Sequence, residues 1–231
     1  MKQYEEGSLV FSHQSAFAFK LNTDGWGVFY EHGKYITIDK TNLWWIELGE
    51  RKSQKEDKIP TATPVGGGFI LIGNPYVYGK QNNFYYLKGG VGQQRLIGGK
   101  GNKNGVAVAA IYGGGLSLGY LKPYYLDVQD ASGKTRQIKF NDSNRHEFLD
   151  PSLIAGTPGF TKGFTEGTFV PGAFGRLALR FDYGRYNEFL SALEVGLNAE
   201  YYSKKMPIMI DVPEKQFFFN AYVAIEFGSR K

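Results

Sequence analysis

The sequence contains no cysteine among its 231 residues. The chain can therefore form no disulfide bond, and it has no thiolate to act as a nucleophile or a metal ligand. It also has no run of eighteen or more apolar residues, which excludes a transmembrane helix. No apolar segment follows Met1–Glu5, so we expect a chain without a signal peptide or one whose leader has been removed.

Histidine and clustered positive charge are also scarce. The net charge is +5, and the basic residues are scattered among acidic ones, so we predict no nucleic-acid partner. Of the three histidines, His13 lies near Ser15 on one strand, where the serine is not aimed at the ring. His146 lies in a loop that offers too few ligands to predict a metal site. We therefore predict no catalytic residue, no cofactor and no metal.

Glycine and aromatic residues are abundant instead. The chain has 31 glycines, 18 phenylalanines and 16 tyrosines, and its mean hydropathy is only −0.34. Glycine and aromatic residues are weak helix formers, and phenylalanine and tyrosine favour strands. The composition predicts an all-β protein whose apolar residues are spread over many short segments.

The C-terminal segment 217–227 shows the strand pattern most clearly. Its odd positions are all apolar, whereas its even positions include Asn220 and Glu226. Successive side chains of a strand point to opposite faces, so one face is apolar and the other carries an amide and a carboxylate. About ten residues is also the length that a tilted strand needs to cross a bilayer.

Seven further segments repeat this alternation: 16–22, 26–31, 44–51, 84–95, 106–126, 176–183 and 188–201. Their apolar faces end in aromatic residues, and their opposite faces carry charges beside glycine and alanine. This is typical of a lipid-facing wall around a narrow interior. We predict an all-β, eight-stranded antiparallel, up-and-down transmembrane β-barrel in the bacterial outer membrane, surrounded by outer-membrane lipid, with both termini in the periplasm.

The predicted connections fit this topology, with residues 1–231 forming a single barrel domain. The turns expected in the periplasm are short and lie near 39–41, 97–104 and 184–186. Outside the cell we expect one tight turn at 23–25 and long loops at about 52–80, 128–172 and 203–215. Short turns on one side and long loops on the other are typical of outer-membrane barrels.

Charged residues fall on the inward faces of these strands. The predicted interior charge network consists of Lys20, Glu31, Glu47, Lys88, Arg176, Arg180, Asp182, Glu194 and Glu226. The same alternation points Arg51, Glu188 and Glu200 inward. Paired carboxylates can serve acid–base chemistry, but side chains fill the interior of an eight-stranded barrel. We favour salt bridges that fill the lumen, because buried ions must be paired.

Glycine-rich runs occur at several places. Gly66–Gly68 and Gly98–Gly101 lack the spacing of a phosphate-binding loop, so we predict flexible loops there. Gly113–Gly115 lies within a strand, and we predict that it kinks the strand or admits a bulky neighbour inside the barrel. The segment 156–169 sets phenylalanines among glycines and threonines, and we expect it to fold over the barrel mouth or to receive a partner.

Short motifs recur through most of the chain. They are Leu21–Trp26, Glu47–Lys52, Leu121–Leu126, Lys162–Phe164, Pro171 with Gly172, Ala192–Gly196, Ile208 with Met209, and Gln216–Phe219. In these segments the chain resembles the PorG-like outer-membrane barrels of the Bacteroidota type IX secretion system. The resemblance implies a non-enzymatic accessory role, in contact with a periplasmic ring of PorK-like lipoproteins and PorN-like proteins.

Basic residues lie at the predicted periplasmic end of the barrel. Lys100, Lys103, Arg230 and Lys231 predict contacts with an acidic partner surface. Two other interpretations stay open. One is a lipid-modifying outer-membrane enzyme, which requires a serine–histidine pair on the lipid-facing surface. The other is a soluble barrel or an adhesion module.

Overall fold

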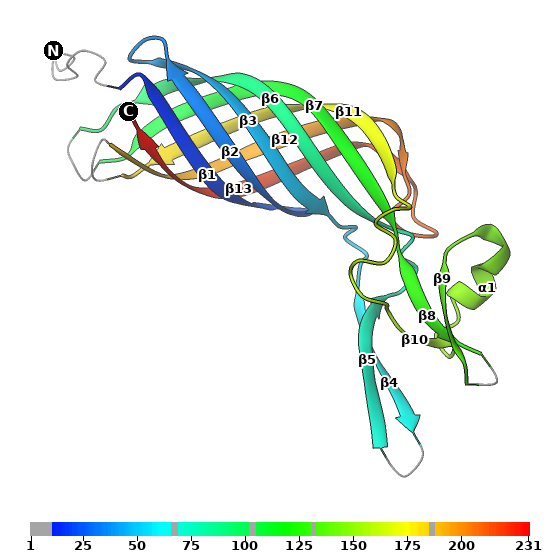
Figure 1. Ribbon diagram of the computed structural model, residues 1–231. Helices are drawn as coiled ribbons and strands as arrows, with labels where there is room; N and C mark the ends of the chain where they lie inside the picture. Colours follow the sequence, from blue (N-terminus) through cyan, green and yellow to red (C-terminus); the bar gives the residue numbers. More distant parts are fainter. Residues whose placement is uncertain (1–10, 66–68, 102–104, 131–132, 185–187) are drawn as a thin grey trace.

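The computed structural model describes residues 11–65, 69–101, 105–130, 133–184 and 188–231. Eight long strands form a closed antiparallel barrel (Figure 1). They are β1 (His13–Asn22), β2 (Gly25–Tyr35), β3 (Lys40–Arg51), β6 (Asn82–Gly98), β7 (Ala107–Pro123), β11 (Thr168–Asp182), β12 (Phe189–Met206) and β13 (Lys215–Arg230). The predicted fold class, an all-β chain with an eight-stranded antiparallel barrel, is confirmed.

The pairing of the first and last strands closes the barrel. In this ladder Phe17 lies opposite Phe227 and Phe19 lies opposite Ile225. The register therefore aligns the outward apolar side chains of adjoining strands in rows around the wall. A closed barrel leaves no strand edge unpaired, which is the condition for a sheet to lie in lipid.

The outer wall of the barrel is apolar. Leu116 is 75% exposed, Val91 is 68% exposed and Phe227 is 62% exposed. Every barrel strand carries such residues, for example Phe19, Tyr30, Ile46, Leu87, Leu118, Leu179, Val195 and Ile225. Soluble monomers rarely expose contiguous apolar surface on this scale, and a belt of this kind matches a lipid surround.

Inside the barrel, aromatic side chains fill space that glycines leave open. Trp45 is 1% exposed and packs edge-on against Phe174, with ring centroids 6.1 Å apart. A Cβ atom at Gly113 would lie 2.8 Å from Cη2 of Trp45, and one at Gly90 would lie 2.7 Å from Cζ2. Gly113 thus admits a bulky interior neighbour, which is one of the two roles that the sequence predicts for its glycine run.

The strand predicted over 106–126 is shorter than expected. β7 ends at Pro123, and Tyr125–Gln129 forms a separate strand, β8, in another sheet. The last pairing of β7 with β6 joins Pro123 to Asn82, the first residue of β6. Proline has no N–H group with which to continue the ladder. The prediction of one continuous strand was therefore wrong at its C-terminal end.

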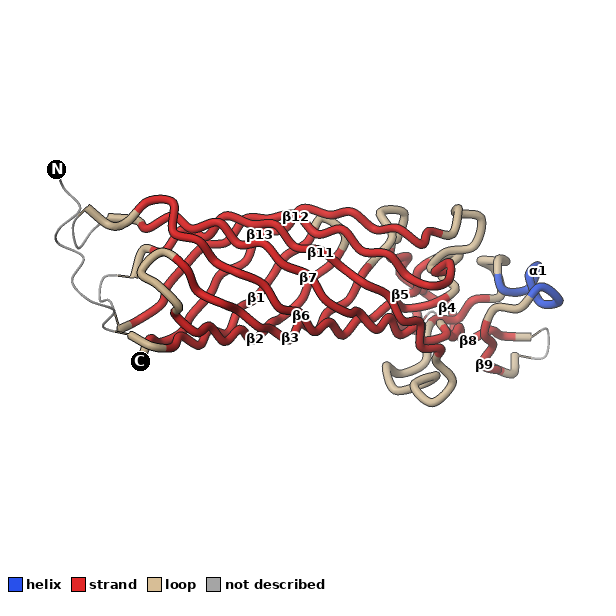
Figure 2. Tube along the Cα trace, turned by 90° about the horizontal axis from the view of Figure 1, so that it is seen from above, coloured by secondary structure: helices blue, strands red, loops and turns tan. Residues whose placement is uncertain are grey.

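A second structured region, which we call the head, lies beyond the barrel end opposite the chain termini (Figures 1 and 2). It contains the hairpin β4 (Lys58–Val65) and β5 (Phe69–Val77), the three-stranded sheet of β8, β9 (Thr135–Lys139) and β10 (Ile154–Gly156), a 3₁₀ turn at Asp142–Asn144, and the helix α1 (Arg145–Phe148). The described residues include no helix that is long and apolar enough to cross a membrane. Two of the predicted long loops thus carry β-structure.

An apolar core of its own holds the head together. Phe148, Leu126 and Val128 are fully buried, and they pack with residues from other segments: Tyr76, Ile138, Ile154 and Ile210. Ile210 comes from the connection between β12 and β13, so this third predicted loop also contributes to the head. The predicted flexibility of Gly66–Gly68 concerns residues outside the described ranges.

Candidate functional site

Charged side chains inside the barrel form two clusters. The first lies nearer the head and is built around Glu47 and Glu200. Nζ of Lys20 lies 2.9 Å from Oε1 of Glu47. Nζ of Lys88 lies 3.4 Å from Oε1 of Glu47 and 2.5 Å from Oε1 of Glu200. Arg51 also pairs with Glu200, so the cluster links side chains from four strands.

The second cluster lies nearer the chain termini and joins two arginines to three glutamates. Nη2 of Arg180 lies 2.7 Å from Glu31 and 3.0 Å from Glu194, and its Nε lies 2.9 Å from Glu226. Arg176 pairs with Glu194, and its Nη1 lies 3.3 Å from Glu31. A guanidinium group presents five donors in a rigid fork, so each arginine can hold several carboxylates at once.

Taken together, the two clusters contain equal numbers of buried cationic and anionic side chains. In the described interior they bring together five cationic and five anionic side chains, each belonging to a residue at most 3% exposed. Removing a charge from water is tolerated when an opposite charge and further hydrogen bonds replace the water. Together with the aromatic core around Trp45, the clusters fill the interior, as expected for eight strands. The arrangement is suited to a structural plug.

The structure places eight of the nine predicted network residues in these clusters and separates the ninth, Asp182, from them. Asp182 lies at the end of β11 near the chain termini, where it pairs with Arg230. Nζ of Lys100 lies 3.2 Å from Oδ1 of Asp182 and donates to the carbonyl oxygen of Gly184 at 2.7 Å. Asp182 therefore connects two turns and the last strand at this end of the barrel.

The four basic residues that were predicted to contact a partner differ in their surroundings. Lys100 and Arg230 are engaged by Asp182, and Nε of Arg230 also donates to the hydroxyl group of Tyr35 at 3.0 Å. Lys231 is exposed. Lys103 lies outside the described residues. Lys100 and Arg230 thus pair with a carboxylate of the chain itself, so part of the positive charge that was predicted to contact a partner is already paired.

Two residues that belong to the observed clusters are missing from the predicted network. Arg51 and Glu200 are each 1% exposed and complete the cluster nearer the head. The signal was present, because strand alternation points both side chains inward. Glu188, in contrast, was predicted to point inward and is exposed. It precedes the first residue of β12, so the strand alternation does not apply to it.

The phenylalanine-containing segment between β10 and β11 folds against the outside of the barrel. Phe164 stacks on Tyr85 and Tyr120, with centroid distances of 6.4 and 6.3 Å. Nζ of Lys122 lies 4.5 Å from the ring centroids of both Phe160 and Phe164. The two tyrosines alternate with buried residues of their strands and face outward. The segment therefore covers the outer wall instead of the mouth that the sequence predicted, because the aromatic surface lies there.

An exposed carboxylate ties this segment to the head. Nζ of Lys139 donates to Oε2 of Glu166 at 2.6 Å, and the hydroxyl group of Tyr125 lies 2.8 Å from both carboxylate oxygens. The hydrogen bond from Lys139 holds the pKa of Glu166 below its ordinary value, and the same bond raises the pKa of Lys139.

On the outer wall near the chain termini, the structure brings Ser15 and His32 together. Oγ of Ser15 lies 2.9 Å from Nδ1 of His32 across the ladder of β1 and β2. A shallow groove beside this pair is lined by His13, His32 and Trp44, among others. In the part of the chain that the structure describes, no carboxylate hydrogen-bonds to His32, and no group of three or more histidine, aspartate or glutamate residues is placed to hold a metal. Sequence reasoning missed the pair because only strand register joins these residues.

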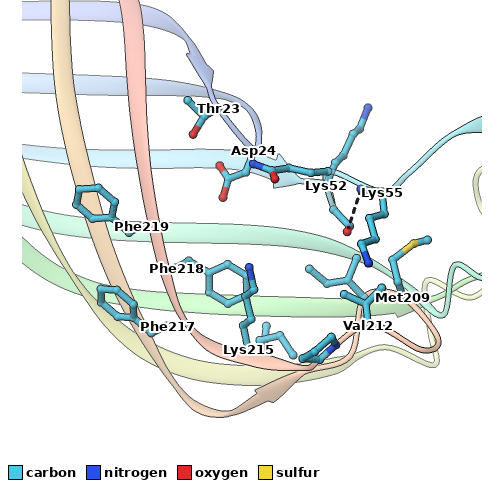
Figure 3. Close-up of a pocket in the computed structure, with 15 residues that line it drawn as sticks. Thr23, Asp24, Lys52, Lys55, Met209, Val212, Lys215, Phe217, Phe218 and Phe219 are labelled. Carbon is cyan, nitrogen blue, oxygen red and sulfur yellow. Dashed lines mark hydrogen bonds between the residues drawn. The ribbon is translucent and has the colours of Figure 1, made fainter.

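A cavity of about 210 Å³ lies where the barrel meets the head (Figure 3). Its lining residues come from the β1–β2 turn, the start of the β3–β4 connection and the β12–β13 connection with its flanking strand ends. Apolar walls come from Met206, Ile208, Met209, Val212, Pro213, Phe217, Phe218 and Phe219, and charged groups come from Asp24, Lys52, Lys55 and Lys215. In Figure 3 Lys55 and Lys215 extend toward the enclosed space, whereas Lys52 extends away from it.

Comparison with known proteins finds likeness in fold only. No family model and no curated protein matches the sequence. Similar solved structures include Neisserial surface protein A (10% identity, 95% of this chain and 96% of that chain, TM-score 0.41). Others are the N-terminal β-barrel domain of Pseudomonas aeruginosa OprF (10%, 94% and 98%, 0.39) and Ail of Yersinia pestis (9%, 95% and 97%, 0.38). All three are outer-membrane barrels, and at this level of similarity no function is transferred from them.

Proposed function

We propose that this chain is a non-enzymatic outer-membrane barrel that anchors an accessory part of a type IX-like protein secretion machinery. The observation that carries the proposal is a barrel with an apolar outer wall and an interior filled by balanced charges. The wall keeps the chain in lipid. The filled interior leaves no lumen for transport, so the useful surfaces are the two ends of the barrel.

The end that carries the chain termini is the proposed contact surface for a periplasmic ring of PorK-like and PorN-like proteins. Lys100 and Arg230 converge on Asp182 there and hold the β6–β7 turn beside the C-terminal strand. The exposed Lys231 lies next in the chain. The exposed Lys231 beside this cluster, which holds two cations and one carboxylate, fits an acidic partner, because complementary charges steer association. The PorG-like motifs support this choice of partner.

The proposal is tested by replacing residues 97–104 with a minimal two-residue hairpin. We expect the barrel to reach the outer membrane and keep its heat-modifiable gel mobility, while the ring proteins no longer co-purify in mild detergent. Replacing residues 36–39, another short turn at this end, is the matched control and should leave the partner bound. Retained co-purification after the first replacement would count against the proposed contact, and extraction of the wild-type chain without detergent would refute the membrane location.

A second candidate function, lipid modification, is favoured by the Ser15–His32 pair. A serine hydroxyl group within hydrogen-bond distance of an imidazole nitrogen is the core of an acyl-transfer site, and this pair lies on the wall that we assign to lipid. We expect a Ser15→Ala variant to abolish labelling by a fluorophosphonate probe if the pair is catalytic. Ser12→Ala is the control, because Ser12 bonds to His13 nearby. Equal labelling of both variants and the wild type would remove this candidate.

A further inference from the structure

We propose that the cavity between barrel and head binds the phosphorylated headgroup of an outer-leaflet glycolipid of the lipid A type. The inference rests on the outer-membrane location and orientation proposed above. It concerns a different surface from the periplasmic contact, so each can fail without the other.

Unpaired positive charge marks the cavity as a site for an anion. Among the described residues, no carboxylate lies within ion-pair distance of Lys55 or Lys215, although both line the same space. Other lysines of this region are paired: Lys52 lies 3.8 Å from Glu50, and Lys80 lies 2.6 Å from Glu56. Both lysines are exposed at the rim of the cavity. Two ammonium groups beside one small cavity, neither of them within ion-pair distance of a carboxylate, favour a phosphate group between them.

The position of the cavity identifies the anion as part of a lipid. Phe217 and Phe219 are 55% and 62% exposed on the outer wall, and both line the cavity. Lys215 lies two residues before Phe217 at the start of β13. Along β13 the exposed apolar residues thus give way to a lysine within two residues. Such a change is expected at the boundary between acyl chains and headgroups. A molecule that bridges this boundary carries an acyl chain and an anionic group.

Asp24, a residue of the cavity wall, has an acceptor that lacks a donor. Arg51 holds Oδ2 of Asp24, whereas Oδ1 of Asp24 is buried and has no hydrogen-bond partner. A buried carboxylate oxygen is stabilised by a donor, and a sugar hydroxyl group supplies one beside the phosphate. At about 30 Å³ for each water, a cavity of about 210 Å³ accommodates a phosphate and part of a sugar ring. The acyl chains would then lie outside it along the wall.

The test measures lipid binding by the purified full chain in mild detergent. Three probes are compared: lipid A with both phosphates, the same lipid A after removal of its phosphates, and inorganic phosphate. The variant Lys55→Gln/Lys215→Gln removes both charges from the cavity. The matched control, Lys204→Gln/Lys205→Gln, removes two exposed lysines of β12 that do not line it. Heat-modifiable gel mobility verifies that each barrel is folded.

We expect the cavity variant to bind phosphorylated lipid A at least about tenfold more weakly than the wild type, because each charge-assisted bond contributes about tenfold. The control variant should stay within about twofold of the wild type. The proposal is overturned if dephosphorylated lipid binds equally well, if both double variants lose affinity alike, or if inorganic phosphate alone displaces the lipid. The lipid measurement needs no partner protein. A negative result would therefore leave the proposed periplasmic contact standing, and a negative pull-down would leave the lipid proposal standing.

Discussion

The barrel and the head are built with opposite polarity. Inside the barrel lie paired charges such as Arg180 and Glu226, and its outer wall is apolar. The head has an apolar interior around Phe148, and the ion pairs that involve β9 and α1 lie on the surface. One of these joins Arg145 to Asp211, whose side chains are 43% and 68% exposed. The same chain therefore buries charge in the barrel and exposes it on the three-stranded sheet and helix of the head.

This contrast shows that the surroundings, and not the type of secondary structure, decide which face of a strand is polar. Lipid does not solvate charge, so in the proposed membrane location the polar half of each alternating barrel strand has to face the lumen, where ions pair with one another. Water solvates charge well, so the head keeps its ions outside and hides its apolar residues. The change of polarity occurs at the cavity, where Lys215 precedes Phe217 in β13.

The largest expected effect comes from breaking the buried network. Arg180→Met removes a cation that contacts three carboxylates and leaves them buried with one arginine fewer. We expect a loss of about 3–5 kcal/mol in the free energy of unfolding, the usual cost of breaking a buried ion pair. Urea unfolding of the barrel in lipid vesicles, followed by tryptophan fluorescence, measures the loss.

The matched control for this prediction is Arg145→Met in the head. It removes the same chemical group from an exposed ion pair, and exposed pairs contribute at most about 1 kcal/mol. If the two variants lose equal stability, the polarity contrast between barrel and head has no energetic meaning.

A smaller and more local effect is expected in the core of the head. Phe148→Ala removes a fully buried ring that packs edge-on against Phe140, with centroids 5.6 Å apart. Truncation of a buried phenylalanine costs about 3–5 kcal/mol, and we expect the lower end because the four-residue helix α1 can shift into the gap. Limited proteolysis should cleave the head of the variant while the barrel keeps its gel mobility. Loss of the barrel together with the head would show that the two regions fold as one unit.

Period-two alternation made the barrel predictable. It located all eight barrel strands, and it pointed Arg51 and Glu200 inward although neither was included in the predicted network. Local sequence could not reveal contacts that depend on register. Ser15 meets His32 because the two lie opposite each other in a ladder, and Trp45 fills the space left by Gly113 on a strand far along the chain.

The head was missed for a related reason. Its strands are short, from three to nine residues, and they lie within stretches whose glycines and prolines are typical of loops. Only contacts between distant segments, such as Ile210 with Leu126, make them a sheet with a core. The distinction between a long loop and a small folded region is therefore not contained in any single window of the sequence.

The smallest expected effect tests the surface charges of the head by pH. The pKa of Glu166 is lowered chiefly by its hydrogen bond from Lys139. The contribution of Glu166 to the stability of the folded state is therefore present above the ordinary glutamate pKa. It is lost as the pH falls through the lower pKa that Glu166 has in the folded state. The pKa of Lys139 is raised by the same bond, so its contribution is present below the ordinary lysine pKa and is lost as the pH rises through the higher folded value. The segment that carries Glu166 should thus be held against the head across the neutral range and released in acid.

Titration of the Glu166 carboxyl carbon by NMR measures this directly. We expect a midpoint below that of a free glutamate in the wild type, and a midpoint closer to the free value in Lys139→Met. The control Lys162→Met changes a neighbouring lysine that lies over the ring of Tyr125 and does not hydrogen-bond to Glu166, so it should shift the midpoint less. Equal shifts in the two variants would mean that general positive charge, and not the Lys139 hydrogen bond, sets the pKa. Surface charges of the head would then act through the solvent, whereas those inside the barrel act through direct pairing.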